Sequence, residues 1–307
     1  MKENEIEICT VAPGIKLIDL GAAIAGYRGF LGAYLLCGDK RAIVDVGPRA
    51  TIPSLLSGLA QIDVGLSSID YIILSHIHID HAGGVGTALK EMNKAKVVAH
   101  SRARSHLIDP ARLWEASLQT LGDMAIEYGD IEPVPEDRIV VAQDLMKLDL
   151  GQGMVLEIYL TPGHAAHHLS LFNRAHSVLI AGETAGVCIG GTIRPATPPP
   201  FKLEETLSSI DRLIALKPEK LCYGHFGCYD DAVDRLQLVR SKILEWHEIV
   251  NSAAKAGNDA EKILSMLREG DKDLEYLNGL DRDEYERENK LLINDIYGLC
   301  GSLQDRT

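Results

Sequence analysis

Apolar and polar residues alternate along short stretches of the first two thirds of the chain, which is the pattern of half-buried β-strands. A first set of predicted strands comprises residues 5–9, 15–19, 33–37, 42–46, 71–74 and 96–100. A second set comprises residues 138–141, 154–160, 168–172, 177–180 and 220–223. Helical spacing of apolar residues predicts helices between the strands, near residues 52–60, 84–93, 110–128 and 204–216. Two groups of strands with intervening helices indicate an α/β fold.

From Asp230 onward the pattern becomes helical throughout, and one stripe of apolar residues recurs at helical spacing. The stripe consists of Leu236, Val239, Ile243, Trp246 and Val250. An apolar patch of this size rarely stays exposed on a monomer, so it packs either on the core of the chain or on a second subunit. We therefore predict a domain of residues 1–229 and a helical extension of residues 230–307, with a homodimer as one candidate assembly.

Composition narrows the class of partner. The 307 residues carry 31 Lys and Arg against 44 Asp and Glu, a net charge of −13, which disfavours a nucleic-acid ligand. The sequence lacks a secretory signal and any apolar run as long as a membrane span, so we expect a cytoplasmic protein with a small-molecule substrate. Six scattered cysteines fit reduced thiols, and Cys222 with Cys228 is the pair that could form a disulfide.

Metal-ligand residue types follow the ends of four predicted strands. His76, His78, Asp80 and His81 follow the strand at 71–74. His164 follows the strand at 154–160, Glu183 follows the strand at 177–180, and His225 follows the strand at 220–223. Loops at one edge of a rigid sheet are where α/β folds assemble their sites, so these side chains are expected to converge.

The spacing within the first group also has a physical meaning. Side chains two residues apart in extended backbone point the same way, so His76 and His78 can bind one cation. Asp80 and His81 fall at the start of the next helix and can face a second cation. By chance His-x-His-x-Asp-His would occur in fewer than about one chain in a thousand. Imidazole and carboxylate donors without thiolate suit zinc, and also iron, manganese or cobalt.

Two further histidines, His167 and His168, lie close to His164 in the sequence. One of them could support a neighbouring ligand, or both could be ordinary loop residues, and the sequence leaves these alternatives open. We expect no metal role for the remaining histidines, which are His100, His106, His176 and His247.

Together these motifs resemble the metallo-β-lactamase fold superfamily over roughly residues 5–230. The likeness rests on Val44-Asp45-Val46-Gly47, the His76–His81 motif, Thr161-Pro162-Gly163-His164, Gly182-Glu183 and Tyr223-Gly224-His225. It implies an αββα sandwich with a dinuclear site at one edge. It also implies that His76, His78 and His164 hold one metal and that Asp80, His81 and His225 hold the other. Glu183 stands where the family carries a bridging aspartate.

The resemblance further implies a metal-dependent hydrolase in which a metal-bridging hydroxide attacks a small ester, thioester, lactone or phosphoester. Its cofactors would be two divalent metal ions, zinc first, with iron or manganese as alternatives. Asp80 is the expected catalytic residue, orienting the hydroxide and passing its proton to the leaving group. The alternative function is a mononuclear iron oxidoreductase resembling persulfide dioxygenases.

The expected pocket walls are the helix at 110–128 and the proline-rich loop Arg194–Pro200. Arg194 could bind an anionic part of the substrate, or it could be a solvated loop charge. We favour the second interpretation, because an arginine in a surface loop is ordinarily hydrated.

Overall fold

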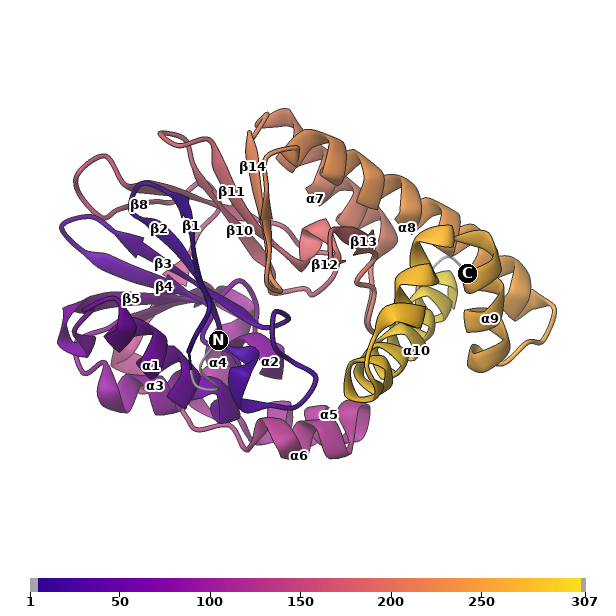
Figure 1. Cartoon of the computed structure of the whole chain (residues 1–307), viewed down its shortest axis with the longest axis horizontal. Helices are drawn as coiled ribbons and strands as arrows, with labels where there is room; N and C mark the ends of the chain where they lie inside the picture. The colour runs from indigo at the N-terminus through magenta and orange to yellow at the C-terminus, as the bar shows by residue number, and fades with distance from the viewer. Residues whose placement is uncertain (1–4, 305–307) are drawn as a thin grey trace.

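Two β-sheets packed face to face, with helices on both outer sides, form the body of the protein (Figure 1). The computed structural model describes residues 5–304. The first sheet has seven strands in sequence order, and the second has six. Side chains of both sheets meet in a shared apolar layer that includes Leu17, Val44 and Ile73 from the first sheet and Ile158 and Ile180 from the second. This αββα arrangement is the predicted fold class.

Antiparallel and parallel pairing divide the first sheet. Its antiparallel strands are β1 (Ile8–Ala12), β2 (Ile15–Asp19), β3 (Gly32–Cys37) and β4 (Arg41–Val44). Its parallel strands, which continue from β4, are β5 (Ile69–Ile73), β6 (Lys96–His100) and β7 (Ile139–Ala142). Strand β1 begins three residues later than predicted, and the other strands match their predicted positions within a few residues.

The second sheet is antiparallel except where β11 pairs with β14. In spatial order its strands are β15 (Cys228–Tyr229), β14 (Lys220–Tyr223), β11 (Val178–Gly182), β10 (Leu169–Asn173), β9 (Val155–Leu160) and β8 (Lys147–Asp149). A separate hairpin consists of β12 (Val187–Ile189) and β13 (Thr192–Arg194). The sequence did not reveal β8, β12, β13 or β15, because strands of two or three residues are too short to show a period.

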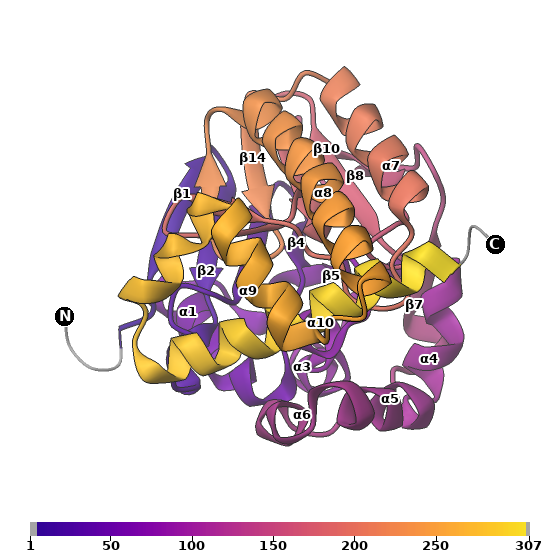
Figure 2. The same ribbon diagram turned by 90° about the vertical axis from the view of Figure 1, so that its right-hand side faces the viewer.

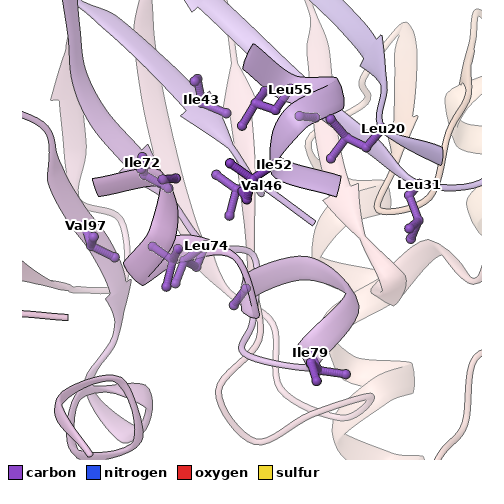
Figure 3. Close-up of a cluster of buried hydrophobic side chains, with 14 of the residues drawn as sticks. Leu20, Leu31, Ile43, Val46, Ile52, Leu55, Ile72, Leu74, Ile79 and Val97 are labelled. Carbon is purple, nitrogen blue, oxygen red and sulfur yellow. The ribbon is translucent and has the colours of Figure 1, made fainter. Parts of the chain in front are cut away.

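Helices of the first half cover the first sheet. They are α1 (Ile52–Gln61), α2 (Ile79–Ala82), α3 (Val85–Glu91), α4 (Arg104–Ile108), α5 (Ala111–Leu121) and α6 (Asp123–Tyr128). Figure 3 shows Ile52 and Leu55 of α1 close to Ile43 of the sheet. The predicted single helix at 110–128 was wrong in one respect. It breaks at Gly122, whose φ of 57° lies in the left-handed region that glycine tolerates.

Of the helices of the second half, α7 (Leu203–Ala215) and α8 (Ala232–Lys255) lie over the other sheet, and α9 (Ala260–Gly270) and α10 (Arg282–Gln304) pack against α8 (Figure 2). Every residue of the apolar stripe from Leu236 to Val250 is buried, in one cluster with Leu213 and Leu221. The stripe therefore packs within its own chain. The domain boundary at residue 230 and the homodimer stay predictions.

Two smaller expectations concern membranes and thiols. No helix in residues 5–304 combines the length and the apolar character that crossing a bilayer requires. Cys222 and Cys228 face each other across β14 and β15 as free thiols, with their sulfur atoms 3.3 Å apart.

Candidate metal centre

All seven predicted ligands come together where the loops after β5, β9, β11 and β14 meet. Two groups of donors result, each with its ligand atoms within 4.8 Å of one another. The first contains His76, His78, His164 and Glu183, and the second contains Asp80, His81 and His225. Both groups match the metal-by-metal division that the resemblance implied, with Glu183 placed in the first.

Close nitrogen and oxygen contacts define the first group. The Oε2 atom of Glu183 lies 2.9 Å from Nε2 of His164 and 3.2 Å from Nε2 of His76. The Nδ1 atom of His78 lies 3.0 Å from each of these two ring nitrogens. Donors about 2.0–2.1 Å from a tetrahedral zinc ion are roughly 3.3 Å apart, so the observed spacing is close to that of a tetrahedral ligand set.

The second group is wider, and Glu183 also contacts it. The Oδ2 atom of Asp80 lies 3.6 Å from Nε2 of His81 and 3.9 Å from Nε2 of His225. The Oε1 atom of Glu183 lies 3.2 Å from Nε2 of His225, and its Oε2 atom lies 3.5 Å from Nε2 of His81. One carboxylate therefore reaches donors of both groups, as a bridging ligand must.

Hydrogen bonds at the outer ring nitrogens fix which nitrogen faces the centre. Nδ1 of His164 lies 3.0 Å from the carbonyl oxygen of Ala196, which can only accept, so this nitrogen carries the proton. The hydroxyl of Ser75 donates to Asp45, so the same oxygen accepts from Nδ1 of His76. In the neutral rings Nε2 of both His164 and His76 then presents a lone pair to the centre.

Asp45 follows β4 and organises this edge of the site. Its carboxylate accepts from the Ser75 amide at 2.8 Å, from the Ser75 hydroxyl at 2.6 Å and from Nδ1 of His81 at 3.1 Å. It thereby orients His81 and, through Ser75, His76. Sequence reasoning assigned Asp45 no role beyond the motif. The available signal was an acidic residue between two valines at a strand end, where burial requires a partner.

His168 supports a ligand and is not an ordinary loop residue, which settles the alternatives that the sequence left open. It is buried, its Nε2 accepts from the Glu183 amide at 3.1 Å, and its Nδ1 lies 2.8 Å from Oγ1 of Thr161. Burial holds its pKa well below the usual value, so it stays neutral. Gly182 permits the contact, because a Cβ atom there would lie 2.5 Å from Nε2 of His168. His167 instead accepts weakly from the Ile77 amide, at 3.4 Å.

A cation fits this donor set. Burial and neighbouring imidazoles hold the pKa of His76 well below its usual value, and burial lowers the pKa of His78 to about 4. Burial opposes ionisation of Glu183, yet the surrounding histidines, His164 foremost, hold its pKa well below the usual range. Nε2 of His81 is buried without a hydrogen-bond partner among the described residues. The neutral rings of His76 and His78, an ionised carboxylate and an unsatisfied nitrogen favour a divalent metal.

A cavity of about 320 Å³ opens onto both groups. Both expected walls line it, α5 with α6 on one side and the proline-rich loop on the other, and α10 adds a third. Asp80 projects toward this space, since its side chain is 18% exposed whereas that of Glu183 is 8% exposed. His106 lines the cavity outside both donor groups.

The interpretation of Arg194 as a solvated loop charge was wrong. Its side chain is buried, its Nε donates to Glu288 at 2.8 Å, and its Nη1 donates to Asp295 at 2.9 Å. Both acceptors lie on α10, so the guanidinium is already paired and does not serve as an anion clamp. The sequence could not show this, because the partners are 94 and 101 residues away.

Comparisons with known proteins agree with the fold. Residues 32–225 match the Metallo-beta-lactamase superfamily profile. The Metallo-beta-lactamase fold-containing protein ST1585 of Sulfurisphaera tokodaii is 32% identical over 219 residues, 70% of this chain and 76% of that protein. A Hydroxyacylglutathione hydrolase of Pseudomonas aeruginosa is 29% identical over 183 residues, 59% of this chain and 55% of that protein.

Solved structures extend the likeness in space. The crystal structure of ST1585 superposes with a TM-score of 0.65 at 28% identity, over 75% of this chain and 86% of that one. A metallo-beta-lactamase family protein from Thermus thermophilus, TTHA1429, has a TM-score of 0.69 at 22% identity, over 97% of this chain and 95% of that one. The second likeness shows the fold alone, and it includes the helical extension. With its donor set, its αββα fold and these relatives, the chain belongs to the metallo-beta-lactamase superfamily.

Proposed function

We propose that this protein is a hydrolase that uses two divalent metal ions to cleave a small ester, thioester, lactone or phosphoester. The observation that carries the proposal is the position of Glu183, whose two oxygens contact donors of both groups. His76, His78 and His164 would hold one ion and Asp80, His81 and His225 the other, with Glu183 between them. Zinc suits these nitrogen and oxygen donors, and iron or manganese are the alternatives.

Two such ions would supply a water of lowered pKa and a Lewis acid for the carbonyl or phosphoryl oxygen. The protein's own contribution is positioning. Asp45 and the Ala196 carbonyl fix the rings of His81 and His164, so the ligand geometry is set before substrate arrives. Asp80 is the partly exposed carboxylate at the cavity, placed to take the proton of the attacking water and deliver it to the leaving group.

The mononuclear oxidoreductase alternative is less well supported. It needs one metal, whereas Asp80, His81 and His225 form a second group of three metal-ligand side chains. The relatives named Hydroxyacylglutathione hydrolase favour hydrolysis. A Flavo-diiron protein of Clostridium acetobutylicum, 23% identical over 162 residues, keeps iron among the candidate metals.

The test is metal analysis together with a hydrolysis panel. Protein expressed without added metal is analysed by mass spectrometry of its elements, reloaded with zinc, iron or manganese, and assayed on esters, lactones, thioesters and phosphoesters. We expect two metal ions per chain and hydrolysis of at least one class. One iron per chain, with oxygen consumption on a persulfide and no hydrolysis, would overturn the proposal in favour of the alternative.

A further inference from the structure

We infer that the substrate carries an unbranched apolar acyl chain and that this chain occupies the cavity beside the metal centre. The inference rests on the proposed function and narrows its substrate class to carboxylic esters and thioesters with acyl chains of medium length. Phosphoesters become poor candidates. The argument uses the walls of the cavity, its charges and its size.

Apolar side chains from four helices form the walls. Leu113 and Leu121 come from α5, Met124 from α6, Ile79 from α2 and Leu291 from α10. Figure 1 shows α5 close to the lower end of α10, and residues of both helices line the cavity. Leu113 and Leu121 are only partly buried, so each keeps apolar surface that a ligand can cover. Covering such surface with a hydrocarbon chain is favourable, because it removes apolar area from water.

The same cavity reaches the reactive groups, since His78, Asp80, Glu183 and His225 also line it. A chain lying against the leucines of α5 can therefore belong to the molecule whose carbonyl lies at the metal centre. The volume of the cavity, about 320 Å³, is at the small end of the roughly 300–1,000 Å³ that is typical of small-molecule sites. One flexible chain fits such a space better than a fused ring system does.

Charge at the cavity argues against a phosphoester. Among the described residues that line it, the arginines are Arg112 and Arg194, and lysine is absent. Arg194 is paired with Glu288 and Asp295, and Arg112 is exposed. Within the described part of the chain no unpaired buried arginine or lysine lines this cavity, whereas sites for a doubly charged phosphate commonly add arginine clamps to their metals. A neutral ester or thioester needs none.

The helix α5 offers a matched pair of variants for a test. Ala116 and Gln119 are both exposed on this helix, but only Ala116 lines the cavity. Ala116→Trp fills the space for the chain, and Gln119→Trp adds the same side chain outside it. Exposed positions tolerate such changes, so both variants are expected to fold.

The experiment measures kcat/KM of the metal-loaded protein on para-nitrophenyl and thioester substrates with acyl chains from acetyl to decanoyl. We expect kcat/KM to rise about four-fold per methylene group until the cavity is full, as burial of a methylene predicts. Ala116→Trp should lower the value for octanoyl far more than for acetyl, and Gln119→Trp should leave the chain-length profile as in the wild type.

A binding measurement separates this inference from the proposed function. Calorimetry with octanol and butanol should show tighter binding of octanol with a negative heat-capacity change, lost in Ala116→Trp and kept in Gln119→Trp. If no substrate is hydrolysed but octanol binding behaves in this way, the hydrolase proposal fails and the apolar-chain site stands. If hydrolysis is independent of chain length and Ala116→Trp changes neither measurement, the apolar-chain inference is wrong and the hydrolase proposal stands.

Discussion

Two clusters of buried ionisable side chains lie on either side of one short stretch of loop, and they differ in how their polar atoms are satisfied. At the metal centre, imidazole nitrogens and two carboxylates converge, and Nε2 of His81 has no hydrogen-bond partner among the described residues. Beneath α10, the Arg194 guanidinium is matched by the carboxylates of Glu288 and Asp295. The first cluster needs a ligand to complete it, whereas the second is complete.

The ion-pair cluster around Arg194 holds the loop at Ala196 and Thr197, and this loop in turn orients His164 of the metal centre. Asp295 accepts from the Thr197 amide at 2.6 Å, while the neighbouring Ala196 carbonyl accepts from His164 at 3.0 Å. Burial outweighs the attraction of Arg194 and raises the pKa of Asp295 to about 7, so this carboxylate depends on its arginine to stay ionised. The comparison teaches that buried charge alone does not mark a functional site. The convergence of metal-ligand atoms around an unpartnered ring nitrogen does.

The largest expected effect is on turnover. We predict that Asp80→Asn lowers kcat/KM by about a thousandfold, because it removes the proposed metal ligand and proton acceptor together. Stability should change little, since Asp80 is half-buried at the cavity. Kinetics on the best panel substrate and urea denaturation measure the two effects.

The exposed Asp137→Asn is the control for Asp80→Asn and should keep full activity. Near-wild-type turnover in Asp80→Asn would remove this residue from the catalytic machinery and weaken the distinction between the two clusters.

Arg194→Met should have the opposite profile and lower the free energy of unfolding by about 3–5 kcal/mol, because Asp295 would stay buried without its cation and Glu288 would keep only Arg287. Urea denaturation of the metal-loaded protein measures the change. Arg112→Met is the matched control. It changes an exposed arginine with no ion pair among the described residues, and should alter stability by less than about 0.5 kcal/mol. Equal stability of the two variants would mean that the second cluster is not structural.

The sequence predicted one cluster and not the other, for a physical reason. Ligands such as His164 and His225 directly follow apolar strands, so a local pattern places them at a sheet edge. Arg194 has no such local signal. Its partners lie on a helix about a hundred residues later, and only the packing of α10 brings them together.

Asp45 and the break at Gly122 were missed for related reasons. The Asp45 partners Ser75 and His81 are 30 and 36 residues away, so hydrogen bonding across strands defines its role. At Gly122 the apolar spacing continues through a residue that the backbone uses to change direction. Periodicity reports which face of a segment is apolar, and it does not report where the segment bends.

His168 lies outside both donor groups but holds the backbone of Glu183, so its substitution tests whether such a residue contributes to metal affinity. We predict that His168→Leu weakens metal binding by about 10–100-fold, because the Glu183 amide loses its acceptor and the Glu183 carboxylate, the proposed bridging ligand, loses its anchor. Competition with a chromogenic chelator measures the affinity. His176→Leu, at a histidine outside both donor groups, should leave the affinity unchanged. Equal affinities in the two variants would show that His168 only fills space.

The smallest effect on turnover is expected from Glu183→Asp, which keeps the carboxylate charge and shortens the side chain by one methylene group. Because the superfamily resemblance calls for aspartate at this position, we expect two metals to remain and turnover to stay within about ten-fold of wild type, with metal affinity changing more than rate. Glu183→Ala is the contrasting variant. It removes the one carboxylate that contacts both groups, and one metal should be lost. Metal titration with counting of bound ions decides between them. Two tightly held metals in the alanine variant would make Glu183 a bystander, and the centre would then have to be assembled by the histidines and Asp80 alone.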